Sequence, residues 1–205
     1  MTFYSPPFWL KAIYPRGLTW SVQTMQREIF LTFDDGPIPV VTPLVLGVLK
    51  KYGVKATFFC VGENVQKYPE VFEQVKQDGH AIGNHTFHHV KAWKTDFGAY
   101  LSEVEQCNQL VKSKLFRPPH GQINRKLTHE IGKDYKIIMW SVLTADYDKN
   151  LSKEQCLTLA VKNTKPGAII VFHDSIKAWE RMEHALPLYI EFCLKEGYSF
   201  EVLGK

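Results

Sequence analysis

Runs of consecutive apolar residues alternate along the chain with longer segments in which apolar residues recur at helical spacing. The runs are strand-sized and lie at 28–33 (EIFLTF), 55–61 (KATFFCV), 136–142 (KIIMWSV), 167–172 (GAIIVF) and near 198–203. Helical spacing occurs at 42–53, 69–78, 96–112 and 179–195, and we expect the last helix to be bent or interrupted near Pro187. Strands alternating with helices predict a parallel α/β sheet or barrel whose strands are buried on both faces.

Individual residues mark the ends of two of these helices. Thr42 is suited to cap the first helix, Pro43 to occupy its first position and Gly53 to end it. Ser152 is followed three residues later by Gln155, and this spacing predicts a capping box at the start of another helix.

Length and composition narrow the class of protein. The chain has 205 residues, which fits one globular domain, and its 45% apolar and 22% charged residues exclude disorder, collagen and coiled coil. No apolar run approaches the roughly 18 residues of a membrane span, so we expect no transmembrane segment. The net charge of +4 is too small to argue for a nucleic acid partner.

The first 27 residues are rich in aromatic side chains. These are Phe3, Tyr4, Phe8, Trp9, Tyr14 and Trp20. We expect this segment to pack on the domain formed by residues 28–205, with contact to a membrane surface or a sugar as the alternative. Ser5, Pro6 and Pro7 interrupt any continuous apolar core of a secretory signal, so the sequence as written predicts a chain that is unexported or already processed.

The four cysteines form no CxxC pair that would indicate a zinc knuckle or a redox motif. They are Cys60, Cys107, Cys156 and Cys193. We expect them to be reduced and buried, although an even number also permits two disulfides in an oxidising compartment.

Several predicted strands run directly into polar side chains of catalytic type. Asp34 and Asp35 follow the first strand, His85 and His89 follow a short apolar piece, and Arg117 and His173 each follow another apolar run. In α/β barrels the carboxyl ends of the strands meet at one mouth. We therefore expect one shared site that contains carboxylates, imidazoles and a guanidinium.

Each of these signals has an ordinary structural explanation when it is taken alone. Adjacent aspartates before Gly and Pro are typical of a turn, and two of eight histidines can be spaced by four residues by chance. Histidines at i and i+4 nevertheless lie on one face of a helical turn and can bind one ion together. Two histidines and one carboxylate leave coordination positions open for catalysis, but iron oxygenases use the same ligands, so the set does not name a reaction.

Five segments together are more specific than any one of them. They read TFDDGP at 32–37, HTFHH at 85–89, RPPHG at 117–121, WSVLTADY at 140–147 and VFHD at 171–174. In this order they resemble the five motifs of the NodB-homology polysaccharide deacetylases, carbohydrate esterase family 4. The resemblance spans about 28–203 and implies a distorted (β/α) barrel of the NodB-homology type with fewer than eight regular units.

The resemblance implies a role for the residues of the first three motifs. Asp35, His85 and His89 would bind a divalent metal ion, most often Zn²⁺, with Co²⁺ or Ni²⁺ as alternatives. Asp34 would be the base that takes a proton from the attacking water, and Arg117 resembles the arginine that pairs with this base.

The same resemblance implies how the oxyanion and the leaving group would be handled. The backbone N–H of His120 would share the oxyanion with the metal. His173 would be the general acid that protonates the leaving amine, and Asp146 would keep its imidazole charged and oriented. The acetyl methyl group would be enclosed by Trp140, Tyr147 and Val171.

The motifs depart from the usual family pattern at four positions. His120 stands where Tyr or Trp is commonest, Leu143 where Asp is common, Tyr147 where Trp is common, and Val171 where Leu is usual. Because Asp146 is retained, we expect altered substrate fit rather than lost chemistry. Val171 would slightly enlarge the methyl pocket.

Other polar residues lie near the motifs without a place in this scheme. We expect His88 to point to a different face from the two proposed ligands, and Asp174 to cap a loop. His80, His129 and His184 are expected to be surface or packing residues.

These observations predict a metal-dependent N-deacetylase that removes acetyl groups from N-acetylglucosamine residues of chitin-type or peptidoglycan glycan. The alternatives are a hydrolase of small cyclic amides on the same fold and a non-catalytic glycan-binding relative. The expected partner is an N-acetylated glycan, and the protein is taken to be a monomer. The visible sequence favours a cytoplasmic location, whereas the expected substrate favours the cell envelope.

Overall fold

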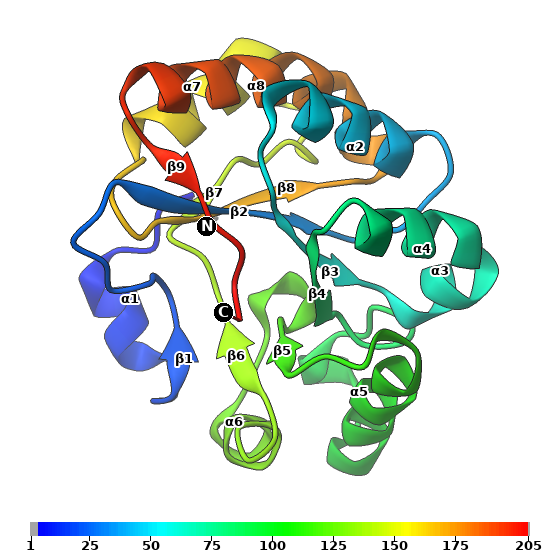
Figure 1. The fold of residues 1–205 in the computed structure, drawn as a ribbon. Coiled ribbons are helices and arrows are strands. Elements are labelled where there is room, and N and C mark those ends of the chain that lie inside the picture. The colour runs from blue at the N-terminus through cyan, green and yellow to red at the C-terminus, as the bar shows by residue number, and fades with distance from the viewer. Residues whose placement is uncertain (1–3, 205) are drawn as a thin grey trace.

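The computed structural model describes residues 4–204, in which nine strands form one curled sheet with helices around it (Figure 1). The strands are β1 (Leu18–Thr19), β2 (Glu28–Asp34), β3 (Thr57–Cys60), β4 (Ala81–Asn84), β5 (Leu115–Phe116), β6 (Lys136–Ile138), β7 (Val142–Leu143), β8 (Ile169–His173) and β9 (Ser199–Phe200). Their order is β1-β6-β5-β4-β3-β2-β8-β7, with β9 beside β2. Neighbouring strands are parallel throughout.

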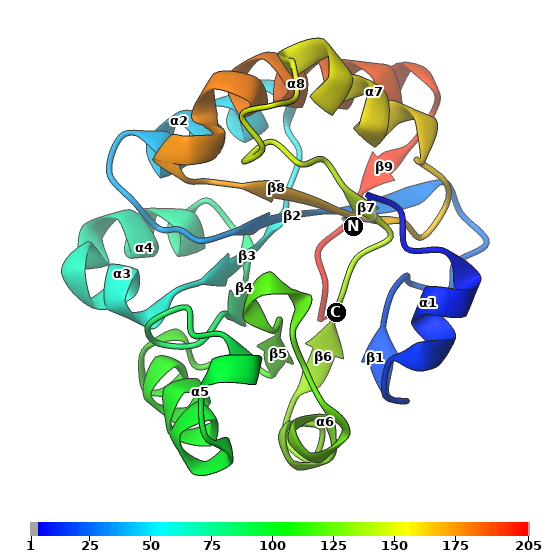
Figure 2. The same ribbon diagram turned by 180° about the vertical axis from the view of Figure 1, so that it is seen from behind.

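The helices lie on the outside of the curled sheet, which the two opposite views show together (Figures 1 and 2). They are α1 (Phe8–Ile13), α2 (Val41–Tyr52), α3 (Gly62–Lys67), α4 (Pro69–Gln77), α5 (Phe97–Val111), α6 (Arg125–Ile131), α7 (Lys153–Lys162) and α8 (Ile176–Lys195), with short 3₁₀ turns at Ala92–Lys94 and Pro119–Gly121. A parallel sheet enclosed by helices confirms the expected distorted (β/α) barrel.

The barrel is not closed by strand pairing between its two end strands, β1 and β7, in the described part of the chain. The N-terminal segment lies across this opening, because the carbonyl of Tyr4 accepts a hydrogen bond of 2.7 Å from the backbone N–H of Leu143. At the other edge of the opening, the carbonyl of Thr19 accepts from the N–H of Met139 at 2.7 Å and so extends the pairing of β1 with β6. Phe3, which belongs to the aromatic N-terminal set, lies outside the described residues.

Alternate residues of the central strands face the inside and the outside of the barrel, as the two-residue period of a strand requires. On β2, Phe30 packs inside the barrel with Ile169 of β8, whereas Leu31 and Phe33 pack under the outer helices. Thr32 and Asp34 therefore share the inner face with Phe30. On β8, the same alternation places His173 on the inner face at the end of the strand.

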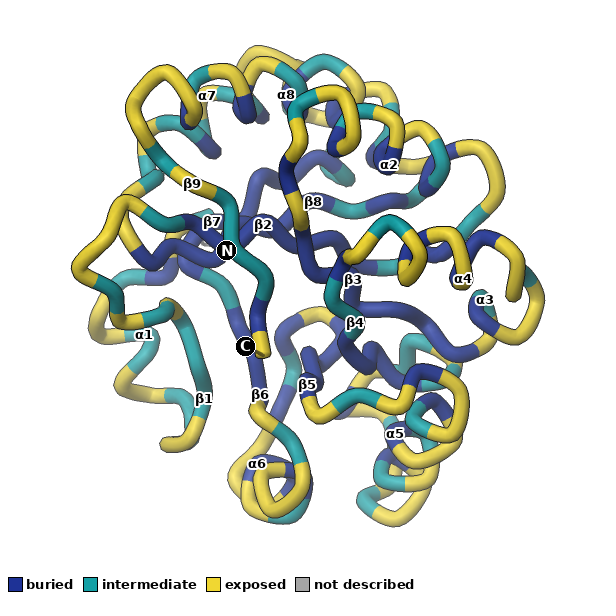
Figure 3. The backbone as a smooth tube through the Cα atoms, in the orientation of Figure 1, coloured by how far each residue is buried: buried dark blue, intermediate teal, exposed yellow. Residues whose placement is uncertain are grey.

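Most of the apolar core lies between the sheet and the helices α2, α7 and α8, with a second cluster under α5 and α6. Figure 3 shows the strands buried at the centre and the exposed positions on the outer turns of the helices. This burial explains why the strands are runs of apolar residues rather than alternating ones.

Two predicted helix ends agree with the structure, and two expectations were wrong. Ser152 and Gln155 form the predicted capping box, and Gly53 ends α2 in the left-handed region with φ 65°. However, α2 begins at Val41, so Thr42 lies inside the helix and its hydroxyl is bonded to a distant carboxylate instead of acting as the cap residue. Pro43 is the third residue of α2 rather than the first. α8 continues through Pro187 without interruption, and a bend at Pro187 stays a prediction.

The four cysteines are free and buried, as expected, and burial raises the pKa of each thiol.

Among the described residues, no helix combines the length and the apolar character that a membrane crossing needs.

Candidate active site

A cavity of about 550 Å³ opens at the carboxyl ends of the strands. Its wall contains residues from all five sequence motifs: Asp34, Asp35, His85, His89, Pro118, His120, Gly121, Trp140, Leu143, Tyr147, Val171 and His173. The structure thus brings the separate motifs to one mouth. The strands do this directly, because Asp34 of β2 lies in register with His173 of β8.

Asp35, His85 and His89 form a cluster whose ligand atoms all lie within 4.8 Å of one another. The Nε2 atom of His89 lies 3.3 Å from Oδ1 of Asp35, and Nε2 of His85 lies 4.0 Å from the same oxygen. Ligands bound at about 2.0–2.2 Å to one tetrahedral ion are separated by distances of this order. The three residues fit a divalent metal ion bound by one carboxylate and two imidazoles.

The environment of His85 suits a metal ligand. Its Nδ1 lies 2.8 Å from the backbone carbonyl of Arg117, which can only accept, so Nδ1 carries the proton and Nε2 presents a lone pair to the cluster. Burial lowers the pKa of His85 well below its usual value, and the neighbouring His89 lowers it further. A neutral imidazole with a fixed tautomer is the form that binds a metal.

Asp34 and Arg117 form a buried ion pair on the inner face of the barrel. Nη1 of Arg117 donates to Oδ1 of Asp34 at 2.6 Å and to the hydroxyl of Thr32 at 2.8 Å, while Nη2 donates to the carbonyl of Met139 at 3.1 Å. The guanidinium also lies 4.0 Å from the ring centre of Phe59. These contacts hold the Asp34 carboxylate in one orientation beside the metal cluster.

His173 and Asp146 form a second pair, and His173 lies on β8 directly beside Asp34 of β2. Nδ1 of His173 lies 2.7 Å from Oδ1 of Asp146, and the backbone N–H of His173 donates to Oδ2 at 2.7 Å. Burial alone would lower the pKa of this imidazole, but attraction and hydrogen bonding to Asp146 outweigh it and raise the pKa to about 9. His173 is therefore an imidazolium at neutral pH.

The buried carboxyl group of Asp174 holds the loop that carries Asp35 in place. The sequence predicted only that Asp174 caps a loop. Asp174 is 1% exposed, and its Oδ1 accepts from the backbone N–H of Gly36 at 3.1 Å while its Oδ2 accepts from Thr42 Oγ1 at 2.6 Å. A Cβ at Gly36 would lie 1.9 Å from this carboxyl group, so the loop needs glycine there. Burial raises the pKa of Asp174 to about 8.

The remaining predicted pocket residues also lie at the mouth. His120 has a left-handed backbone, φ 57°, and its ring centre lies 4.6 Å from that of His89. Trp140 and Val171 lie in the cavity wall, and the ring of Tyr147 contacts that of His173 with centres 4.9 Å apart. The methyl-binding role of these three side chains stays a prediction.

The other histidines lie outside this cluster. His88 pairs with Glu103 at 2.8 Å and points away from the two metal-ligand candidates, as expected. His80 is buried, with its Nδ1 accepting from the backbone N–H of Ala56, and burial lowers its pKa to about 4. His129 and His184 are at the surface.

Several wall residues were not identified as site residues from the sequence. Pro6, Leu10, Tyr14 and Trp20 come from the N-terminal segment, and Lys177 comes from the first turn of α8. The aromatic density of the N-terminal segment was the available signal for the first group. No motif or spacing distinguished Lys177 from other surface lysines.

Metal-dependent hydrolases combine three features: a cluster of metal ligands, a carboxylate that can accept a proton and an imidazole that can donate one. The mouth contains side chains suited to each of these three features. The barrel and its mouth place the protein in that class. The family model for polysaccharide deacetylases matches residues 21–137, which is more than half of the chain. The chain belongs to this family of carbohydrate deacetylases, as the five motifs suggested.

Individual relatives resemble the chain over most of its length. A peptidoglycan-N-acetylglucosamine deacetylase of Bacillus cereus is 35% identical over 211 residues, which cover 95% of this chain and 95% of the relative. A chitooligosaccharide deacetylase of Azorhizobium caulinodans is 33% identical and covers 73% of this chain and 74% of its own. The crystal structure of the peptidoglycan N-acetylglucosamine deacetylase Bc1960 matches with a TM-score of 0.88 and 30% identity, covering 96% and 94% of the two chains.

Proposed function

We propose that the protein removes acetyl groups from N-acetylglucosamine residues of peptidoglycan, with Zn²⁺ as the metal ion. One observation carries the proposal: the metal-ligand cluster, the Asp34–Arg117 pair and the His173–Asp146 pair line a single mouth. The relatives named for peptidoglycan and chitooligosaccharide deacetylation support the substrate class. The reaction would take place in the cell envelope, where this polymer lies.

The bound metal ion would polarise the acetamide carbonyl and make a water molecule more acidic. The chain supplies the proton acceptor, because Asp34 stands next to Asp35 and is held at one oxygen by Arg117. Its Oδ2 is left to take the proton from the attacking water. The hydrogen bond from the buried guanidinium keeps this carboxylate oriented for that proton transfer.

The proton needed by the leaving amine would come from His173. An amide nitrogen does not leave as an anion, so an acid must be present when the C–N bond breaks. Nδ1 of His173 is occupied by Asp146, which leaves Nε2 as the donor. The backbone N–H of His120 would stabilise the oxyanion, and Trp140, Tyr147 and Val171 would surround the acetyl methyl group.

The test of the proposal is acetate release from peptidoglycan fragments and chitooligosaccharides, with mass spectrometry of the sugar products. Chelator-stripped protein should be inactive, and zinc, cobalt or nickel should restore free-amine sugar. If the protein cleaved small cyclic amides but released no acetate from any glycan, it would be a hydrolase of small cyclic amides instead. Tight glycan binding without turnover under any metal would indicate a non-catalytic relative.

Metal binding should also stabilise the fold, which gives a readout that does not depend on activity. With free metal at 100 times its Kd, the native state gains about 2.7 kcal/mol, which corresponds to a rise in Tm of about 5–10 °C for a chain of this size. Calorimetry of stripped and reloaded protein measures this shift. The variant His85→Ala should show no such rise, and an equal rise in that variant would place the ion elsewhere.

The pKa of His173 predicts how the reaction depends on pH. An acid works only while protonated, so kcat should fall as the pH rises through the His173 pKa, which Asp146 holds at about 9. A metal dication bound at the same mouth would disfavour the protonated imidazole. The alkaline limb of the pH profile, where kcat falls, should therefore lie at a somewhat lower pH than this value. Asp146→Asn removes the negative charge and should move the limb down by about one pH unit or more.

The measurement is kcat on a neutral chitooligosaccharide between pH 5.5 and the point of unfolding, for wild type and Asp146→Asn. Asp148→Asn is a suitable control, since Asp148 lies two residues away and bonds only to its own loop around Asn150. An alkaline limb that stays in place in Asp146→Asn would exclude His173 as the acid.

A further inference from the structure

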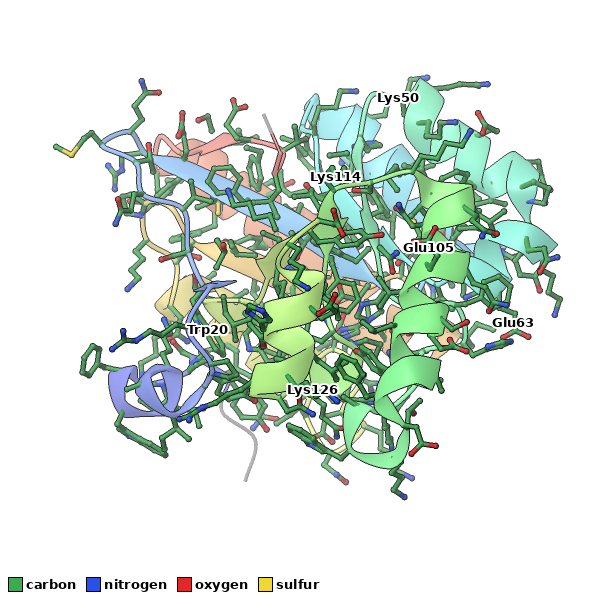
Figure 4. All side chains as sticks on the ribbon, turned by 90° about the horizontal axis from the view of Figure 1, so that it is seen from below. Trp20, Lys50, Glu63, Glu105, Lys114 and Lys126 are labelled. Carbon is green, nitrogen blue, oxygen red and sulfur yellow. The ribbon has the colours of Figure 1, made fainter. Side chains whose placement is uncertain are left out.

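A second cavity, of about 760 Å³, lies beside the catalytic mouth. Its walls come from the segment between α1 and β1 and from α6 with the turn that follows it: Ala12, Tyr14, Pro15, Arg16, Gly17, Arg125, Thr128, His129, Gly132 and Tyr135. We call it the arginine groove. Figure 4 shows this side of the molecule, with α1 and α6 next to each other and Trp20 labelled between them.

All the charged side chains that line the arginine groove are basic. Its lining contains Arg16, Arg125 and His129 and no carboxylate. Among residues 4–204, neither guanidinium has an ion pair or a hydrogen bond, in contrast to Arg117 in the active site. Three acidic residues lie outside the lining: Glu130 is paired with Lys133 at 2.8 Å, and Glu105 and Asp134 are close enough to Tyr135 to affect its pKa. Two unpaired arginines on one groove form a binding surface for an anion.

The polar groups of the groove that carry no charge are suited to the same ligand. Burial raises the pKa of Tyr14, and burial together with the nearby Glu105 raises that of Tyr135 to about 12, so both phenols keep their protons. A neutral phenol can donate a hydrogen bond to an anion without repelling it.

The groove and the catalytic cavity meet at one shared side chain, that of Tyr14. Tyr14 lines both cavities, and its hydroxyl donates to the carbonyl of Gly121 at 3.2 Å, next to His120. Its ring packs edge-on against Trp20, which in turn contacts Trp140 in the catalytic wall. A polymer bound with one sugar at the metal cluster would have to cross Tyr14 to reach the arginines.

We propose that the arginine groove binds carboxylates carried by the sugar next to the one being deacetylated, and so selects peptidoglycan over chitin. The proposal rests on the deacetylase function proposed above. In peptidoglycan, every second sugar is N-acetylmuramic acid, whose lactyl ether carries a peptide with free carboxylates. Chitin carries no charge at this position. Arginine binds carboxylates through bidentate hydrogen bonds, which the single ammonium group of lysine does not form.

The test compares substrates that differ in charge. KM and kcat are measured on peptide-bearing glycan oligomers and on neutral chitooligosaccharides for wild type, Arg125→Glu and the double variant Arg16→Glu/Arg125→Glu. KM for the peptide-bearing substrate should rise about five- to tenfold in the single variant and more in the double variant. KM and kcat for the neutral substrate should stay within about twofold, since this substrate carries no carboxylate for the arginines to bind.

Lys126→Glu is the matched control because it changes the charge by the same amount at the neighbouring position of α6. Its Nζ lies 3.9 Å from the ring centre of Phe97, on the side of α6 that faces α5 (Figure 4). It should leave KM for both substrates unchanged. The proposed role of the groove would be wrong if Lys126→Glu raised KM for the peptide-bearing substrate as much as Arg125→Glu does. It would also be wrong if the arginine variants raised KM equally for the neutral substrate.

Binding measured by calorimetry separates the groove from the catalytic proposal. Wild type should bind the peptide-bearing glycan more tightly than a chitooligosaccharide of the same length, whether or not either is turned over, and Arg125→Glu should remove the difference. Hydrolysis of the amide that links the peptide frees the lactyl carboxylate and removes the peptide carboxylates, so the affinity of this stripped glycan shows which carboxylate the arginines bind. No preference for either anionic glycan would overturn the proposal, even in an active enzyme.

Discussion

Replacing Asp34 by Asn should lower kcat by about 10³-fold, because the proton of the attacking water would lose its acceptor. Asn keeps the size of the side chain, and its Oδ1 can still accept from Nη1 of Arg117, whose contact with Asp34 is 2.6 Å long. The metal cluster of Asp35, His85 and His89 is untouched, so metal content should remain that of the wild type. Acetate release and metal analysis on the same preparation measure the two effects.

The neighbouring substitution Asp35→Asn is the matched comparison. It changes the same functional group one position further along the chain, but Asp35 lies 3.3 Å from Nε2 of His89 and belongs to the metal cluster. Asp35→Asn should therefore weaken metal binding, and excess metal should recover part of its activity. Excess metal should not recover Asp34→Asn. If excess metal had the same effect on both variants, the assignment of Asp34 as the base and Asp35 as the metal ligand would be wrong.

The mouth of the barrel was predictable because the motif residues lie at or just after the carboxyl ends of buried strands. The two-residue period of β2 turns Thr32 and Asp34 to the same inner face, where Arg117 reaches both. His173 ends β8 in register with Asp34, so a run of apolar residues followed by histidine already implied its place. Sheet geometry thus converts separate sequence segments into one site, without needing any contact to be known beforehand.

The parts that sequence did not predict depend on contacts between distant segments. Thr42 has the composition of a helix cap, but its hydroxyl bonds to Asp174, which is 132 residues away. The two-residue strands β1 and β5 are too short to show a period, and α6 and α3 are only one or two turns long. The N-terminal segment lines the catalytic cavity because it lies across the open side of the barrel, a position that its sequence does not encode locally.

The buried pair of Arg117 and Asp34 predicts the largest loss of stability from one substitution. Arg117 is fully buried and Asp34 is 5% exposed. Arg117→Met keeps an unbranched chain against Phe59 but leaves the Asp34 carboxylate buried without its cation, which costs about 3–5 kcal/mol. The control Arg27→Met removes an exposed guanidinium that lies over the ring of Tyr198, and should change stability by about 0.5 kcal/mol or less. Urea unfolding of the metal-free proteins measures both.

The double variant Asp34→Asn/Arg117→Met shows whether this cost comes from the unpaired charge or from lost packing. If the charge is responsible, removing it should relieve part of the damage, and the double variant should be more stable than the sum of the single variants predicts by about 1–3 kcal/mol. Simple additivity would mean that Arg117 stabilises the barrel through Thr32, Met139 and Phe59 instead. Because Arg117 also orients the carboxylate of Asp34, the proposed base, Arg117→Met should lose activity even under conditions in which it remains folded.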